Sequence, residues 1–202
     1  VHGPMIGALI LIPLSEYIRA ANSGRLPGID LVIYGVLIIL VILFQPEGIV
    51  DLVRKIVADA GLDLRRVYPE LDAEKTLGEV LLTPTQIYVK QVLDVIHQLD
   101  VHGVAHITGG GFDENIPRIL GEGQGILINE GSWTILPVFR CLEQWGNIPH
   151  REMFNIFNMG IGMVLAMDGS DAQAAIDILA KHGLHATVIG SIVEGKGVEI
   201  RG

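Results

Sequence analysis

Cysteine, aromatic residues and basic residues are all scarce in this chain. Its single cysteine, Cys141, excludes an internal disulfide framework and a cysteine-based metal site, and such sparse use of cysteine is typical of a cytoplasmic protein. Only 14 residues are lysine or arginine against 23 acidic ones, so the net charge is −9. Because no basic stripe can neutralise phosphates, the composition argues against a nucleic-acid partner. A small phosphorylated ligand remains compatible, since a local group of backbone N–H donors can bind it.

Long hydrophobic runs are confined to the first 48 residues. They occupy residues 5–14 and 31–44, and a polar linker separates them. The second run has 14 uncharged residues, fewer than the roughly 20 that a full membrane span requires. It also lacks the polar face that a soluble core helix usually shows. We therefore interpret residues 1–48 as an apolar, membrane-like helical segment with a possible membrane contact through these two runs.

From residue 49 onward the sequence has the pattern of a soluble domain. Apolar residues recur at helical spacing at its start: Val50, Val53, Ile56 and Val57. This helix is predicted to end before Gly61, and a second one to begin with Thr83 as N-cap and Pro84 as first residue. Beyond residue 80 short strands alternate with helices, which indicates a layered α/β or α+β domain. Four or five short strands favour a compact mixed sheet covered by helices.

Three consecutive glycines, Gly109 to Gly111, separate a strand candidate (GVAHI) from a short helix candidate beginning near Asp113. Each glycine costs roughly 0.5–1 kcal/mol relative to alanine, so the run needs a reason. One interpretation is an anion site, where unpaired N–H groups at a helix start hold a phosphate and Thr108 adds a hydroxyl. The other is a tight turn in which Asp113 merely caps the helix. The pattern matches neither the P-loop nor the G-x-G-x-x-G motif.

His106 and the stretch FNMGIGM are further candidates for function. His106, two residues before Thr108, could donate to a phosphate or act as an acid–base group, although a lone histidine at a strand end is more often structural. In FNMGIGM, Gly160 and Gly162 are predicted to alternate along a strand and to leave one face bare beside Asn158. Such a face admits a closely packed helix or a ligand. The other histidines show no ligand spacing, so we predict no metal site.

The motifs TPTQIYVK, AHITGGGFDENIPR, GSW and FNMGIGM together resemble one family. From about Asp51 onward the sequence is similar to the C-terminal domain of the phosphoribosylformylglycinamidine cyclo-ligases, also called aminoimidazole ribonucleotide synthetases. The resemblance implies the α+β fold of that domain, over residues 49–202. It also implies a ligase of purine biosynthesis, which closes the ring of formylglycinamidine ribonucleotide to aminoimidazole ribonucleotide with ATP and Mg²⁺ as cofactors. Its small-molecule partner would be a phosphorylated ribose.

The same resemblance assigns roles to individual residues. His106 would be catalytic, and no residue would bind a metal. The substrate-binding residues would be Thr108, Gly109, Gly110, Gly111, Asn115, Asn158 and Gly160.

Residues 1–48 depart from this family and resemble the last membrane segments of branched-chain amino-acid ABC transporter permeases. We interpret the chain as a fusion, whether a natural one, a damaged locus or an assembly error. In the cyclo-ligases an N-terminal domain supplies most of the ATP site and builds the homodimer, so we expect this chain to be inactive alone and to self-associate. Three functions stay open: half of a cyclo-ligase, a transporter component, and a phosphate-binding module without catalysis.

Overall fold

The computed structural model describes residues 49–202. The chain divides into two units, Val1–Glu47 and Gly48–Gly202. The runs 5–14 and 31–44, together with the membrane contact expected of them, lie outside the described residues. Within residues 49–202, no helix has the length and hydropathy needed to cross a bilayer.

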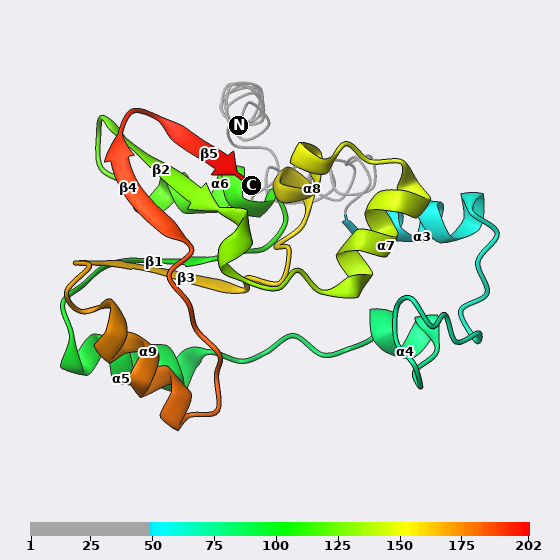
Figure 1. The fold of residues 1–202 in the computed structure, drawn as a ribbon, viewed down its shortest axis with the longest axis horizontal. Helices are drawn as coiled ribbons and strands as arrows, with labels where there is room; N and C mark the ends of the chain where they lie inside the picture. The colour runs from blue at the N-terminus through cyan, green and yellow to red at the C-terminus, as the bar shows by residue number, and fades with distance from the viewer. Residues whose placement is uncertain (1–48) are drawn as a thin grey trace, which may run out of the picture. The chain divides into compact units, whose positions relative to one another are not determined.

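The second unit combines short helices and short strands (Figure 1). The α-helices are α3 (Ile49–Asp59), α4 (Leu77–Leu81), α5 (Val89–Gln98), α6 (Gly111–Asn115), α7 (Pro137–Gly146), α8 (His150–Ile156) and α9 (Ala172–Lys181). Two 3₁₀ helices are η1 (Ile116–Ile119) and η2 (Glu130–Ser132). The strands are β1 (Val101–His106), β2 (Gln124–Asn129), β3 (Met163–Met167), β4 (Gly190–Glu194) and β5 (Gly197–Arg201).

The strands form two sheets. β1 pairs with β3 in antiparallel fashion, and the other three strands are ordered β4-β2-β5. In that second sheet β2 runs antiparallel to β4 and parallel to β5, so the sheet is mixed. The expected α+β class with a mixed sheet covered by helices is therefore confirmed. Hydrogen bonding divides the strands between two sheets, a partition that local pattern did not indicate.

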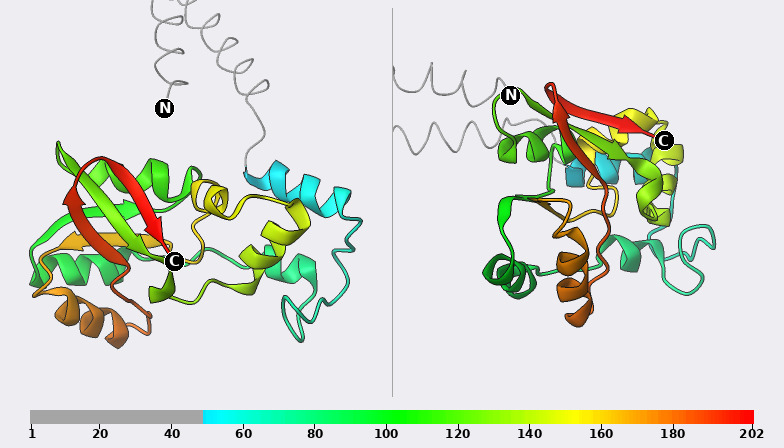
Figure 2. Two further views of the ribbon diagram at one scale, coloured as in Figure 1. Left: turned by 45° about the horizontal axis from the view of Figure 1, so that its top comes forward. Right: turned by 60° about the vertical axis from the view of Figure 1, so that its left-hand side comes forward.

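The β1–β3 pair lies between a helical layer and the larger core. On one face, Leu165 and Met167 pack against buried residues of α5 and α9, among them Val95 and Ile178. On the other face, buried side chains of both strands join β2, α6 and α8 in the main core: Ala105, Val164, Ile126, Ile128, Phe112 and Phe154. Figure 2 shows α5 and α9 together on one side of this pair and the three-stranded sheet on the other. β3 thus has apolar neighbours on both faces, whereas in β1 the residues that alternate with buried Ala105, namely His102, Val104 and His106, are exposed.

The predicted first helix is confirmed as α3, and Gly61 follows its end with a φ of +61°. The predicted start of the next helix is wrong, because α5 begins at Val89 and not at Thr83. Residues 83–88 form a drawn-out connection from α4 to α5 (Figure 1). The Thr83 hydroxyl donates to the carbonyl of Glu79 at 3.3 Å and so completes α4. The residues after this cap-like dipeptide are exposed up to Ile87, and the first residue with tertiary contacts is Tyr88, which packs against Gly162.

Candidate functional site

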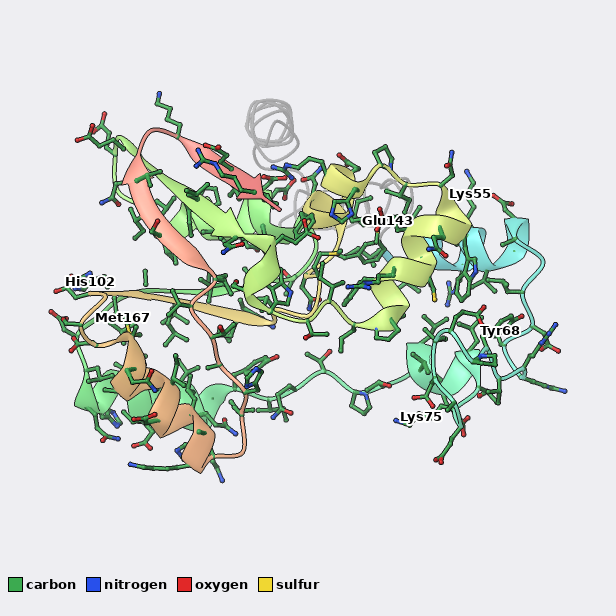
Figure 3. All side chains as sticks on the ribbon, in the orientation of Figure 1. Lys55, Tyr68, Lys75, His102, Glu143 and Met167 are labelled. Carbon is green, nitrogen blue, oxygen red and sulfur yellow. The ribbon has the colours of Figure 1, made fainter. Side chains whose placement is uncertain are left out.

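Two turns flank the same end of the β1–β3 pair. His106 at the end of β1 pairs with Met163 at the start of β3, and the N–H of Ile107 donates to the carbonyl of Gly162 at 2.9 Å. The turn after β1 is residues 108–111, here called the glycine turn. The turn before β3 is residues 158–162, here called the second turn. The opposite end of the pair carries the labelled residues His102 and Met167 (Figure 3).

The three residues of the glycine run have different surroundings. Gly110 and Gly111 have φ values of +85° and +51°, a region that side chains rarely adopt. A Cβ on Gly111 would collide with the backbone carbonyl of Phe154, so α8 can approach only a glycine here. A Cβ on Gly110 would meet the side chain of Glu114. A Cβ on Gly109 would have space, since the nearest atom among residues 49–202, Cδ1 of Ile49, would lie 3.6 Å from it.

Asn115 lies behind the glycine turn and shapes it. Its side chain is only 3% exposed, the one polar residue of the described chain that is buried to this degree. The amide nitrogen Nδ2 donates to the carbonyl of Gly111 at 2.7 Å, of Gly109 at 3.2 Å and of Thr108 at 3.5 Å. Because these carbonyls point inward to Asn115, the turn presents other backbone groups outward.

The outward groups include amide donors. Thr108 and Gly109 are exposed, and the N–H groups of Gly109 and Gly110 meet no acceptor among residues 49–202. The N–H of Gly111 is used within the turn, by the carbonyl of Thr108 at 3.0 Å. The helix after the turn begins at Gly111, with Gly110 as N-cap and no capping side chain. The alternative in which Asp113 caps this helix is therefore wrong.

Asp113 is instead engaged by Arg151 of α8. The guanidinium donates to both carboxylate oxygens, at 2.7 and 2.6 Å, and also to the carbonyl of Val198 in β5 at 3.3 Å. Sequence reasoning left Arg151 out, because 38 residues separate it from Asp113. No motif within a few residues of either side chain predicts this ion pair.

The prediction that Gly160 and Gly162 lie within a strand is wrong. Residues 158–162 precede the strand, which begins at Met163, so Gly160 and Gly162 do not alternate along it. Gly160 has a φ of +95°, and its N–H donates to the side-chain oxygen of Asn158 at 3.1 Å. The indole N–H of Trp133 donates to the carbonyl of Met159 at 3.0 Å. Side chains from far along the chain hold this segment as a turn, which periodicity alone could not show.

Gly162 packs against Tyr88, from the connection before α5. A Cβ on Gly162 would overlap the phenol of Tyr88. The Tyr88 ring also lies edge-on to His106, with ring centres 6.4 Å apart, and burial raises the pKa of the phenol. One aromatic side chain thus joins the IYVK motif to both glycine-bearing motifs.

His106 faces a shallow apolar pocket of about 450 Å³. It is lined by residues 86–88 of the connection, by three residues of α5 (Val89, Val92 and Leu93), and by His106 and Met163. His106 is exposed, and its imidazole has no hydrogen-bond partner among residues 49–202. The structure therefore places His106 at the same end of β1–β3 as the two turns, on the side of Tyr88.

His150, at the start of α8, bridges two carboxylates. Its Nε2 lies 2.9 Å from an oxygen of Glu130, and its Nδ1 lies 2.9 Å from an oxygen of Glu143 in α7. The pKa of His150 is raised above its ordinary value, chiefly by the hydrogen bond with Glu130 and further by that with Glu143, while partial burial acts in the opposite direction. The imidazolium form therefore ties α8 to α7 and to η2. This triad was not predicted from the sequence.

Residues 49–202 contain no group of three histidine, cysteine or acidic side chains placed to hold a metal ion. The donors expected of a Mg²⁺ site are thus not gathered in the described part of the chain.

Residues 49–202 thus form an α+β domain in which two glycine-bearing turns lie at one end of a strand pair. The chain belongs to the family described as AIR synthase related protein, C-terminal domain, which matches residues 38–202. The match begins ten residues before the boundary predicted at residue 48, and that boundary stays a prediction. So does the permease resemblance of residues 1–48.

Curated relatives of this chain are named phosphoribosylformylglycinamidine cyclo-ligases. The chain is 50% identical over 153 residues to the phosphoribosylformylglycinamidine cyclo-ligase of Bacillus cereus strain G9842, and 49% identical to that of Bacillus cytotoxicus. Each alignment covers 75% of this chain and 44% of the relative, so the chain spans less than half of their length. The resemblance stated from the motifs is confirmed for this C-terminal part.

A solved structure with a similar fold is the crystal structure of E. coli HypE. The TM-score is 0.50 at 23% identity, over 65% of this chain and 39% of that one. At this identity the similarity concerns the fold alone.

Proposed function

We propose that residues 49–202 form one side of the substrate cleft of a phosphoribosylformylglycinamidine cyclo-ligase. The 50% identity to the Bacillus cereus enzyme over 153 residues carries this proposal. The other side of the cleft would come from the part of the relatives that this chain does not match. The substrate would be formylglycinamidine ribonucleotide and the product aminoimidazole ribonucleotide, made at the expense of ATP.

In this proposal the glycine turn holds the substrate through its free backbone amides. The N–H groups of Gly109 and Gly110 are the donors, and Thr108 adds its hydroxyl. Asn115, predicted above as a substrate-binding residue, is buried and would act from behind, because its amide holds the carbonyls inward and leaves the donors outward. Donors fixed before the ligand arrives need no reorganisation when a charge is placed against them.

Asn158 and Gly160 would line the same cleft from the second turn. Both turns flank one end of β1–β3, which supports a shared cleft. His106 keeps its proposed acid–base role, for which its exposed ring is available. ATP, when bound, would supply the phosphoryl group that activates the formyl oxygen. Its Mg²⁺ would be held by the nucleotide and by groups outside residues 49–202.

Reconstitution tests the proposal. The full chain is mixed with the separately expressed N-terminal domain of the Bacillus cereus relative, and ADP release is followed with ATP and formylglycinamidine ribonucleotide. We expect turnover in the mixture and none from either part alone, because half of a cleft cannot align donor and acceptor. Turnover by this chain alone would contradict the half-cleft proposal. Substrate binding by the chain without turnover in the mixture would favour the binding module instead.

Gly109→Ala separates ligand binding from folding. The added methyl has space, so the unfolding free energy should change by less than about 0.5 kcal/mol. If the substrate approaches this backbone closely, its dissociation constant, measured by calorimetry, should rise roughly tenfold or more. Gly169→Ala is the matched control, because Gly169 lies outside both turns and a Cβ added there would meet no atom within 4 Å. Equal affinities for these two variants would argue against the glycine turn as the ligand site.

A cytoplasmic location, a homo-oligomer and a membrane contact of residues 5–14 and 31–44 remain predictions. Sedimentation of the full chain without detergent tests the last of these, and a wholly soluble chain would contradict it.

A further inference from the structure

We infer that Arg151 is a positioning residue for the substrate, which it serves by pairing with Asp113 and removing a negative charge from beside the glycine turn. This inference rests on the proposed function and extends it to a residue outside both turns. Arg151 would not touch the substrate.

The geometry of the pair is that of a strong, oriented contact. Two guanidinium nitrogens of Arg151 reach the two carboxylate oxygens of Asp113, at 2.7 and 2.6 Å, in the bidentate arrangement that favours arginine over lysine. The third contact, to the carbonyl of Val198, fixes the guanidinium against β5. The hydrogen bond to Asp113 also raises the pKa of Arg151, which keeps the cation charged.

The charge of Asp113 matters because of where this residue stands. Asp113 is the third residue of α6, directly after the turn whose amides are proposed to bind phosphate. A second carboxylate, that of Glu114, already lies against Gly110. Without Arg151 two unpaired carboxylates would flank the turn and repel an anion. With Arg151 in place only Glu114 opposes the ligand.

A purely mechanical role for the pair is less well supported. The glycine turn is already held by Asn115 and by the close approach of Gly111 to Phe154. The Arg151 side chain is 50% exposed, and ion pairs open to solvent add little to stability. Its electrostatic effect on a nearby phosphate should therefore exceed its effect on folding.

A rescue experiment separates the two roles. The full chain carries Arg151→Gln, Asp113→Asn, or both, and the dissociation constant of formylglycinamidine ribonucleotide is measured by calorimetry. We expect Arg151→Gln to weaken binding roughly tenfold, since the charge of Asp113, two residues after the turn, is then uncompensated. Asp113→Asn alone should bind at least as tightly as the wild type, because the guanidinium of Arg151 keeps its positive charge, and the double variant should recover wild-type affinity. At about 1 M salt, where the Debye length is about 3 Å, the loss should largely vanish.

Two further variants complete the design. Arg151→Lys keeps the charge and should retain most of the affinity even if Arg151→Gln proves too unstable to measure. Arg54→Gln breaks another exposed arginine–aspartate pair, Arg54–Asp51 on α3, and should leave affinity unchanged.

Wild-type affinity in Arg151→Gln, or a double variant as weak as Arg151→Gln, would overturn the inference and leave the proposed function intact. A tenfold loss in Arg151→Lys would also overturn it. Absence of binding by the wild-type chain would overturn the proposed function and the inference together.

Discussion

Gly111 in the glycine turn and Gly162 in the second turn are both crowded, but by neighbours of different kinds. A side chain on Gly111 would strike the backbone of Phe154, whereas one on Gly162 would strike the phenol of Tyr88. Backbone within a packed helix cannot move without displacing the core, while a side-chain tip can turn away. The glycine turn is therefore built into the core, whereas the crowding at Gly162 comes from one movable aromatic side chain.

The largest effect is expected from Gly111→Ala. The left-handed conformation costs about 1–2 kcal/mol in alanine, and the overlap with the Phe154 carbonyl forces α8 to shift. We expect a loss of at least about 3 kcal/mol in the free energy of unfolding, measured by urea denaturation. Gly169→Ala serves as the control and should be near neutral. Equal unfolding midpoints for the two variants would contradict this account of the glycine turn.

A smaller effect is expected from Gly162→Ala, about 1–2 kcal/mol, because the Tyr88 ring can rotate away from the new methyl. In a Tyr88→Ala background the same change should cost much less, since the overlap is gone. The double-mutant cycle in urea denaturation measures this coupling, which we expect to be about 1 kcal/mol. Strict additivity would mean that Tyr88 does not determine the need for glycine at this position.

The smallest effect is expected from the titration of His150 in α8, which supports the glycine turn. Its pKa is raised in the folded state, so its contribution is fully present below the unfolded value near 6.5 and is lost as pH rises through the folded value. The stability difference between the wild type and His150→Gln should therefore shrink from pH 6 to pH 8. We expect less than about 1 kcal/mol, because half of the imidazole is exposed. A difference that grows with pH would contradict the assigned sign.

Much of the fold was predictable because its signals are local. The apolar spacing of α3 and the glycine after it mark that helix correctly. The alternation of short strands and helices left α/β or α+β open, and the family resemblance selected α+β. The residues of the family motifs meet at one place in the structure. Tyr88 of IYVK, His106 of AHITGGG and Gly162 of NMGIGM come together although 74 positions separate the first from the last.

The errors have a common physical cause. Thr83 and Pro84 have the local pattern of a helix start, yet residues 83–88 are drawn out toward the contact of Tyr88 with Gly162. Gly160 looks like a strand residue by alternation, yet the contact of Trp133 with Met159 and the side chain of Asn158 hold a turn there. In each case a contact distant in sequence outweighs a weak local preference.

The sequence by itself determined the class of fold, the family and the position of the glycine turn, because periodicity, breakers and motifs act over a few residues. Only the tertiary structure decided why each glycine is needed and which charges face the turn. Arg151 and Asp113 are 38 residues apart, and Gly111 of α6 meets α8, from which four other elements separate it in the chain. Such approaches arise when α6 and α8 pack into one core, and no local pattern encodes the distance between two packed elements.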